Sequence, residues 1–442
     1  MKKSTLTLAV ALGVLAQQAG AAGFIEDSKA TLKLRNFYIN TDNRNHGTNT
    51  TSNYQEEWGQ GFQLDYTSGF TEGTVGFGVD AIGLLGIRLD SGKGRHGNPT
   101  SASYAGSVFP TDSSGRAVND YSSLGAAAKV KISQTELRYG TLLPKNPVIS
   151  YNDGRMLPQT FEGGQITSNE IKDLTLTAGQ IEHVKGRNSS NTEGLSIAGA
   201  NNARTGNFSN QFRYAGADYK VTKDLLLQYW YGGLEDFYKQ HFLGAVHNWA
   251  IGPGVLKSDF RYFHSTDDGK NGDTAGYYTT GYYGGTTTKG KVDNDLYSAL
   301  FLYTVAGHTF GGGYQKSRGD SDFPWLNQGD GSSNYTITDS QIQKFGRAGE
   351  STWQARYSYD FAKVGVAGLT AGVVYLKGDN IDAAIGDRTE WERDFTLAYV
   401  VPEGPLKNLG VMWKNATWRS DIANTKDQDE NRLIVSYSIP LL

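Results

Sequence analysis

Segments in which apolar and polar residues alternate follow one another from Thr31 almost to the end of the chain. Alternation with a period of two places apolar side chains on one face of a β-strand and polar side chains on the other. In Thr352–Phe361, for example, Trp353, Tyr357 and Phe361 share one face. The pattern predicts eighteen strands: Thr31–Asn40, Gly59–Thr67, Thr74–Leu84, Ala127–Ile132, Glu136–Leu142, Gly164–Ser168, Leu174–Glu182, Asn210–Tyr219, Leu225–Leu234, His241–Trp249, Val255–His264, Asp295–Val305, Thr309–Ser317, Thr352–Phe361, Thr370–Lys377, Thr389–Val400, Val411–Ser420 and Arg432–Leu441.

The connections between these segments alternate between long polar loops and turns of a few residues. The long loops are Thr41–Glu57, Asp90–Ser123, Pro144–Glu162, Lys185–Ser209, Gly269–Asn294 and Arg318–Ser351. Bacterial outer-membrane barrels combine short periplasmic turns, longer extracellular loops and an even number of strands. We therefore predict an all-β fold, an 18-stranded antiparallel transmembrane β-barrel, closed so that lipid meets no unpaired strand edge. Tryptophans expected in the belts at its two membrane interfaces are Trp230, Trp249, Trp353, Trp391 and Trp413.

The N-terminus has the composition of a secretory signal. Lys2 and Lys3 precede an apolar run, Leu6–Leu15, and small residues follow up to Ala22. We expect residues 1–22 to be a signal peptide and residues 23–442 to form one barrel. The chain has no cysteine, which excludes disulfides and thiolate metal sites. Its formal net charge of −3 argues against a nucleic-acid partner.

Many basic residues occupy the polar faces of the predicted strands and are expected to point into the lumen. They are Lys33, Arg35, Lys129, Lys131, Arg138, Arg213, Lys257, Arg261, Arg356, Arg388, Lys414 and Arg432. Lumenal acids are expected to be fewer, and they include Asp65, Asp80, Glu136, Asp259 and Asp360. A basic strip in a narrow channel concentrates anions and can bind carboxylates. The alternative is that these cations only pair with lumenal acids and stiffen the wall.

Arg393 does not follow this pattern, because alternation places it beside Phe395 and Leu397 on the apolar face. Signals for an enzyme are weak. The seven histidines are scattered, and the chain contains no G-x-S-x-G motif. We expect no enzymatic activity, no cofactor and no metal. A β-rich hydrolase and a plugged structural or adhesion barrel remain as alternatives.

Several stretches resemble the OprD-type family of outer-membrane porins, whose members are substrate-specific carboxylate channels. They are Gly23–Ser28, Leu34–Tyr38, Ser68–Ala81, Arg155–Thr160, Trp353–Tyr357, Gly404–Leu409 and Glu430–Tyr437. The resemblance implies that the third and seventh long-side loops fold into the lumen. It also implies a ladder of basic residues along the wall, and Arg35, Arg138, Arg155 and Arg432 sit in stretches that match the family. Together with lumenal cations from the strands they form the candidate substrate path: Lys33, Arg35, Lys129, Lys131, Arg138, Arg155, Arg356, Arg388, Lys414 and Arg432. Met412 and Lys414 stand where relatives commonly carry arginine.

The seventh loop would place Asp320, Asp322 and Asp330 as constriction acids opposite this ladder. The expected function is passive uptake of small carboxylates, with aromatic or cyclic acids favoured by the Trp391–Asp394 stretch. The expected location is the outer membrane of a Gram-negative bacterium. Expected partners are membrane lipid, the solutes and the barrel-assembly machinery, and a homo-oligomer is left open. An amino-acid-preferring or cation-preferring pore is the alternative within the family.

Overall fold

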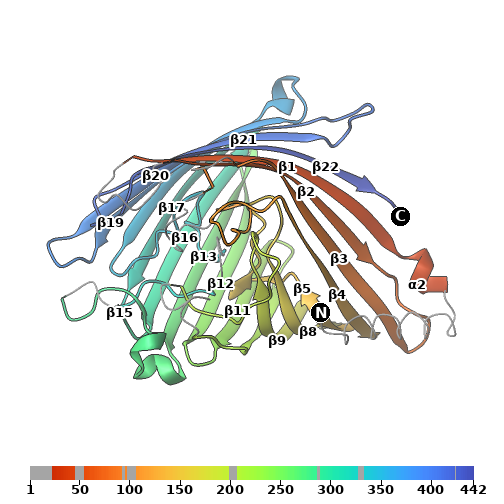
Figure 1. Ribbon diagram of the computed structural model, residues 1–442, viewed down its shortest axis with the longest axis horizontal. Helices are drawn as coiled ribbons and strands as arrows, with labels where there is room; N and C mark the ends of the chain where they lie inside the picture. The colour runs from red at the N-terminus through yellow and green to blue at the C-terminus, as the bar shows by residue number, and fades with distance from the viewer. Residues whose placement is uncertain are drawn as a thin grey trace.

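The described part of the chain forms one closed antiparallel barrel (Figure 1). The computed structural model describes residues 22–44, 54–91, 95–96, 106–198, 207–285, 289–326, 333–423 and 425–442. Eighteen strands pair each with its neighbour along the chain, and the first strand also pairs with the last. Residues 1–21 lie outside the described part, so the signal peptide stays a prediction. No helix in the described part is both long and apolar enough to cross a membrane.

The predicted strand count is confirmed, and each predicted segment overlaps one strand of the barrel. The barrel strands are β1 (Lys29–Asn43), β2 (Tyr54–Thr67), β3 (Val75–Asp90), β4 (Asp120–Ile132), β5 (Thr135–Leu142), β8 (Thr160–Ile171), β9 (Leu174–Lys185), β10 (Phe212–Lys220), β11 (Leu225–Leu234), β12 (Tyr238–Ile251), β13 (Gly254–Asp267), β16 (Asp293–Val305), β17 (His308–Arg318), β18 (Ser351–Asp360), β19 (Leu369–Ile381), β20 (Arg388–Val400), β21 (Gly410–Ser420) and β22 (Gln428–Pro440). Two small hairpins lie in loops, β6 (Lys145–Asn146) with β7 (Ile149–Ser150) and β14 (Thr279–Thr280) with β15 (Lys289–Gly290). The helical pieces are α2 (Ala22–Glu26), η1 (Gly269–Gly272), η2 (Ala275–Tyr277) and η3 (Phe361–Val364).

Several strands begin or end further towards the long loops than alternation predicts. On β1 the inner-face residues Phe37 and Ile39 are buried, whereas Asn36 and Asn40 lie on the outer face. On β4 the inner-face Tyr121 is buried in the same way. Polarity therefore no longer marks the lumenal face at the long-loop ends, and the sequence pattern stops before the strands do.

Tight turns join the strands at the opposite end of the barrel. Between β16 and β17, Ala306 and Gly307 have φ of 51° and 85°, as a two-residue turn with both central residues left-handed requires. The helix α2 lies at this end, and Phe24 O accepts a hydrogen bond from Gly69 N of 2.9 Å. We call the two ends the short-turn end and the long-loop end.

Long loops fill the lumen with apolar side chains at the long-loop end. One buried cluster joins wall residues such as Phe242 and Phe263 to Val148 of the third loop and Phe323 of the seventh. A second cluster packs Met156 and Leu157 of the third loop against the inner wall. The predicted inward folding of these two loops is thereby confirmed. The loop between β3 and β4 also folds inward, which the sequence did not indicate, since Val108 and Phe109 belong to the second cluster.

The outer face carries exposed apolar and aromatic side chains, such as Phe77, Leu85, Phe301 and Leu433. Trp353, Tyr375 and Trp391 form a row of neighbouring rings, with centroid distances of 5.4 Å and 5.9 Å. The prediction for Trp230 is wrong. Its side chain is buried inside the barrel, where its Nε1–H donates to Asp218 Oδ1 at 3.0 Å.

Candidate functional site: a constriction between two loops and a basic wall

The third loop (residues 143–159) and the seventh loop (residues 319–350) meet at the inner face of β22. Arg432 makes the connection. Its Nη1–H donates to Gly154 O at 3.5 Å, and its Nη2–H donates to Gln341 O at 2.9 Å. Its Nε–H donates to Glu430 Oε1 at 2.6 Å. Arg432 is almost fully buried, and its main role is therefore to hold both loops against the wall.

Arg35 holds the tip of the third loop from the neighbouring strand β1. It binds Asp153 bidentately, with Nη1 2.6 Å from Oδ1 and Nη2 3.0 Å from Oδ2. Its Nη1–H also donates to Arg155 O at 2.7 Å. A two-pronged guanidinium–carboxylate contact fixes orientation as well as distance. The loop residues 153–155 are thereby fixed in the lumen beside Arg432.

Two further wall arginines donate to carbonyl groups of the seventh loop. Arg261 of β13 donates to Tyr335 O at 3.0 Å and lies 4.0 Å from the centroid of the Tyr335 ring. Arg356 of β18 donates to Ile337 O at 2.6 Å. Arg261 also pairs with Asp259 at 2.7 Å. Counting Arg432, three wall arginines therefore donate to backbone carbonyls of the seventh loop.

Carboxylates on β20 accept the N–H groups of the same loop. Glu392 accepts from Ile342 N and Gln343 N, both at 2.8 Å, and Asp394 Oδ2 accepts from Gln341 N at 3.0 Å. Such an arrangement satisfies backbone groups that the barrel wall buries. The seventh loop is thus held on both its donors and its acceptors.

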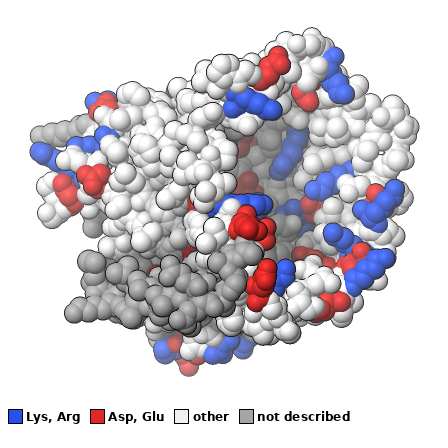
Figure 2. Space-filling model, turned by 90° about the vertical axis from the view of Figure 1, so that its right-hand side faces the viewer, with Lys and Arg blue, Asp and Glu red and all other residues white. Residues whose placement is uncertain are grey.

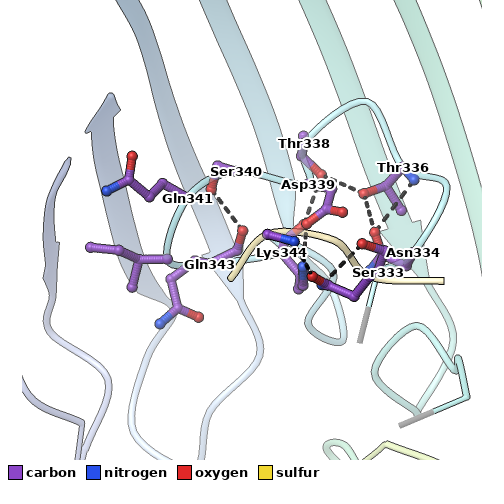
Figure 3. A network of polar contacts seen from close by, with 12 residues as sticks. Ser333, Asn334, Thr336, Thr338, Asp339, Ser340, Gln341, Gln343 and Lys344 are labelled. Atoms are coloured by element: carbon purple, nitrogen blue, oxygen red, sulfur yellow. Dashed lines mark hydrogen bonds and ion pairs between the residues drawn. The ribbon is translucent and has the colours of Figure 1, made fainter. Parts of the chain in front are cut away.

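Side chains within the seventh loop add local bonds (Figure 3). Thr338 Oγ1–H donates to Lys344 O at 2.7 Å, and Ser340 Oγ–H donates to Gln343 O at 2.7 Å. Lys344 and Asp339 form an ion pair within the same turn. The described residues of the loop are therefore held by their own side chains as well as by the wall.

Lys414 of β21 stands next to Arg432 in the strand register and points to the same lumenal side. No carboxylate oxygen among the described residues lies within ion-pair distance of its amine. Arg155 is 4.0 Å from Glu430 through Nη2. The constriction therefore combines paired cations with the unpaired positive charge of Lys414.

Basic and acidic residues are mixed along the short-turn half of the lumen. Lys33 pairs with Asp65 at 2.7 Å, and Lys129 pairs with Asp80 at 2.8 Å. Arg138 pairs with Glu136 and lies 3.3 Å from Asp80. The expectation that cations outnumber acids along the wall needs this correction, since inner-face acids also include Glu57, Glu390, Glu392, Asp394 and Glu430. The prediction that Arg213 faces the lumen is wrong, because its neighbours Phe212 and Tyr214 are buried inside and Arg213 lies on the outer face of β10.

Two recesses open beside these charges. One of about 270 Å³ is lined by Lys33, Asp65 and Arg138 together with Asp153 of the third loop. The other, of about 490 Å³, shares Arg138 and includes Lys131. Figure 2 shows the end of the barrel on which Lys, Arg, Asp and Glu lie together around a hollow.

The remaining predicted site residues lie away from the constriction. Lys131 is exposed and lies 5.5 Å from the centroid of the Phe70 ring, and Arg388 lies at the long-loop end of β20. Asp320 is exposed, and Asp322 accepts hydrogen bonds from Ala348 N and Thr280 Oγ1 at 2.9 Å each. Asp330 lies outside the described residues.

The acids that do contact ladder cations at the constriction are Asp153 and Glu430, which the sequence did not single out. Alternation could have identified Glu430, because it shares the inner face of β22 with Arg432. No comparable signal marks Asp153 or Gln341, because both reach the constriction through loop folding.

Comparisons with known proteins place this arrangement among porins. A family model described as outer membrane porin, OprD family, matches residues 22–441. The chain is 37% identical over 440 residues to porin-like protein GalP of Pseudomonas putida, covering 99% of this chain and 97% of that protein. It is 33% identical over 473 residues to Porin D of Pseudomonas aeruginosa, covering 100% and 99%.

Solved structures agree in fold. The crystal structure of Pseudomonas aeruginosa OccK8 (OprE) has a TM-score of 0.87 and 61% identity, with 95% of this chain and all of that chain (100%) covered. The crystal structure of Pseudomonas aeruginosa OpdK with vanillate has a TM-score of 0.82 and 36% identity, with 95% and 100% covered.

Proposed function

Because this chain belongs to the OprD family of outer membrane porins, we propose that it admits small carboxylate-bearing solutes by passive diffusion. Its place is the outer membrane of a Gram-negative bacterium, with the long loops outside the cell and the short turns in the periplasm. The walls of its channel hold solutes by charge and hydrogen bonding, and no step of the proposal requires bond chemistry.

The observation that carries the proposal is the unpaired Lys414 at the constriction. A carboxylate that reaches this level meets an ammonium group that lies next to Arg432 and forms no ion pair with a described acid. In a narrow channel with low-dielectric walls, such a charge attracts anions strongly. The exposed Lys131 supplies a second positive position towards the periplasmic mouth.

The recesses of the lumen are large enough for the proposed solutes. The recess of about 270 Å³ between the wall and the third loop and the recess of about 490 Å³ in the wall can each hold a single-ring acid. The relative OpdK has a crystal structure with vanillate, an aromatic carboxylate. We extend that chemical class to this chain as part of the proposal.

The test is single-channel recording in planar bilayers, with the reversal potential measured under a KCl gradient. Benzoate, vanillate and pyroglutamate are added in turn to the wild type, Lys414→Met and Lys414→Arg. Lys223→Met is the matched control, because Lys223 lies in a periplasmic turn with its side chain 90% exposed.

We expect anion preference and concentration-dependent block in the wild type, loss of block in Lys414→Met and retention in Lys414→Arg. Cation preference without block would contradict the carboxylate proposal and favour an amino-acid-preferring or cation-preferring pore controlled by Asp153 and Glu430. A folded barrel without conductance would contradict transport altogether.

A further inference from the structure

Arg393 is a basic residue on the membrane-facing surface of the barrel. Its chain neighbours Glu392 and Asp394 bind the seventh loop inside the lumen, so alternation turns Arg393 outward. It pairs in register with Tyr375 of β19 and Thr417 of β21. Trp391 and Phe395 flank it on the outer face of β20.

Neighbouring strands hold its guanidinium in one place. Nη2–H donates to Asn415 Oδ1 and to Thr417 Oγ1, both at 3.0 Å. Asn415 in turn donates through Nδ2 to Asn431 Oδ1 at 3.0 Å. Three polar side chains on the outer face therefore support one cation.

Within the described residues, no carboxylate lies at ion-pair distance from Arg393. The outward cations on the two neighbouring strands, β19 and β21, differ in this respect. Lys377 pairs with Asp379 at 2.9 Å, and Arg419 pairs with Asp429 at 3.0 Å. A guanidinium carries five N–H donors, and the two bonds of Arg393 leave most of them for another partner.

The height of Arg393 in the membrane indicates which partner this is. Six residues separate it from Tyr399 near the periplasmic end of β20, which corresponds to about 20 Å along the strand. Trp391 and Tyr375 beside it belong to the aromatic row that suits a membrane interface. At the usual strand tilt of about 35–45°, this distance corresponds to about 15 Å along the membrane normal, so Arg393 lies in the outer-leaflet half of the wall at the level of the aromatic row. An anion there offsets the cost of a lipid-facing arginine.

Polar side chains continue along this level from β20 to β2. Trp58 Nε1–H donates to Asn36 Oδ1 at 2.8 Å, and Asn36 donates to Gln60 Oε1 at 3.3 Å, all on the outer face. The next strand, β3, instead presents Leu85 and Ile87 outward. On this side of the barrel, the row of polar side chains therefore ends at β2.

We propose that Arg393, supported by Asn415 and Thr417, binds a phosphate group of an outer-leaflet glycolipid. The acyl chains of this lipid lie along Phe395 and Leu397, below the guanidinium. This lipid site is independent of the solute that passes through the lumen.

The experiment uses the full-length folded porin in detergent. Native mass spectrometry and thermal unfolding are followed during titration with bis-phosphorylated lipid A, dephosphorylated lipid A and inorganic phosphate. The variants are Arg393→Met and Arg393→Lys, and Lys377→Met is the control, since it removes a nearby cation that is already paired. Single-channel conductance verifies that each variant is folded.

We expect the wild type to bind bis-phosphorylated lipid A about tenfold more tightly than the dephosphorylated form, as one charge-assisted contact would give. Arg393→Met should lose this preference, Arg393→Lys should keep part of it, and Lys377→Met should keep all of it.

Three results would overturn the proposal. One is equal binding of both lipids by the wild type, or an unchanged preference in Arg393→Met. Another is a full rise in the thermal unfolding temperature with inorganic phosphate alone, which would indicate a free-anion site. The third is a lipid-free oligomer that Arg393→Met dissociates, which would assign the row of polar side chains to contact between copies of this chain.

Discussion

Individual cations of the ladder differ in what surrounds them, and this decides what each can do. Lys129 has only 2% of its side chain exposed, and its amine binds Asp80 at 2.8 Å and Ser68 O at 2.7 Å. Lys131, two residues further, is exposed on the same face. Buried pairs act on stability, whereas exposed cations act on passing ions.

Exchanging each lysine for methionine separates these roles. Lys129→Met leaves Asp80 without its nearest cation, and we expect the free energy of unfolding to fall by about 3 kcal/mol with little change in ion selectivity. Lys131→Met should leave stability unchanged and shift the reversal potential towards cations. Urea unfolding monitored by tryptophan fluorescence, together with bilayer recording, checks both. A shift in reversal potential without destabilisation in Lys129→Met would contradict the assignment.

Alternation could predict that the ladder cations of the strands face the lumen, but it could not predict their partners. Lys33–Asp65 and Arg138–Glu136 join residues of neighbouring or the same strands, and such pairs follow from register. Arg35–Asp153 joins a strand to a loop tip 118 positions later in the chain. Contacts of that kind depend on how the loop folds, which a period-2 pattern does not contain.

At the scale of elements, the seventh loop is held by wall side chains at several points. Arg432 also holds the third loop, so its removal should release both. We expect Arg432→Met to raise mean conductance and add current fluctuations, because Gly154 O and Gln341 O lose their donor. Arg388→Met, at the outer end of β20, is the control. A quiet channel of unchanged conductance in Arg432→Met would show that the other contacts suffice.

A buried carboxyl group makes the base of the seventh loop sensitive to pH. Burial, with the nearby charge of Glu390, raises the pKa of Glu350 well above its usual value. Glu350 accepts a hydrogen bond from Arg347 N at 3.0 Å, so it lies inside the base of the loop. A carboxyl group with a raised folded-state pKa stabilises the folded loop at low pH, and this contribution is lost as the pH rises through that pKa.

Hydrogen exchange measures this effect directly. After correction for the intrinsic rate, we expect backbone amides of residues 334–348 to exchange faster at pH 8 than at pH 5. Glu350→Gln keeps the shape of the side chain without its charge, and in this variant the corrected exchange rates should differ little between pH 5 and pH 8. Glu403→Gln, on an exposed periplasmic turn, should leave it unchanged. Equal dependence in Glu350→Gln and the wild type would exclude Glu350 as the cause.

The strands themselves could be predicted from the sequence, and their extracellular ends could not. Lipid outside and water inside enforce alternation along the periplasmic half of each strand. Towards the extracellular end the lumen contains folded loops, so Phe37 and Tyr121 face inward as core residues. There the inner face contacts loop side chains instead of water, so polar residues no longer mark the inner face.

At the scale of the whole molecule, net charge and channel charge point in opposite directions. The chain carries a formal net charge of −3, yet the proposed solute path passes the unpaired Lys414. Most wall charges are paired, so the preference for anions rests on few groups. Such a preference should depend strongly on ionic strength, because the Debye length falls from about 10 Å at 0.1 M salt to about 3 Å at 1 M.

Carboxylate block measured at several salt concentrations tests this view of the channel. We expect the half-blocking concentration of benzoate to rise about tenfold between 0.1 M and 1 M KCl in the wild type, since salt in the channel screens the attraction between a lumenal charge and an approaching anion. Benzoate should block the Lys414→Met channel only weakly at every salt concentration, and its half-blocking concentration should change little with salt. If block in the wild type were insensitive to salt, direct contacts at short range, such as those that Arg155 offers, would have to dominate over the field of Lys414.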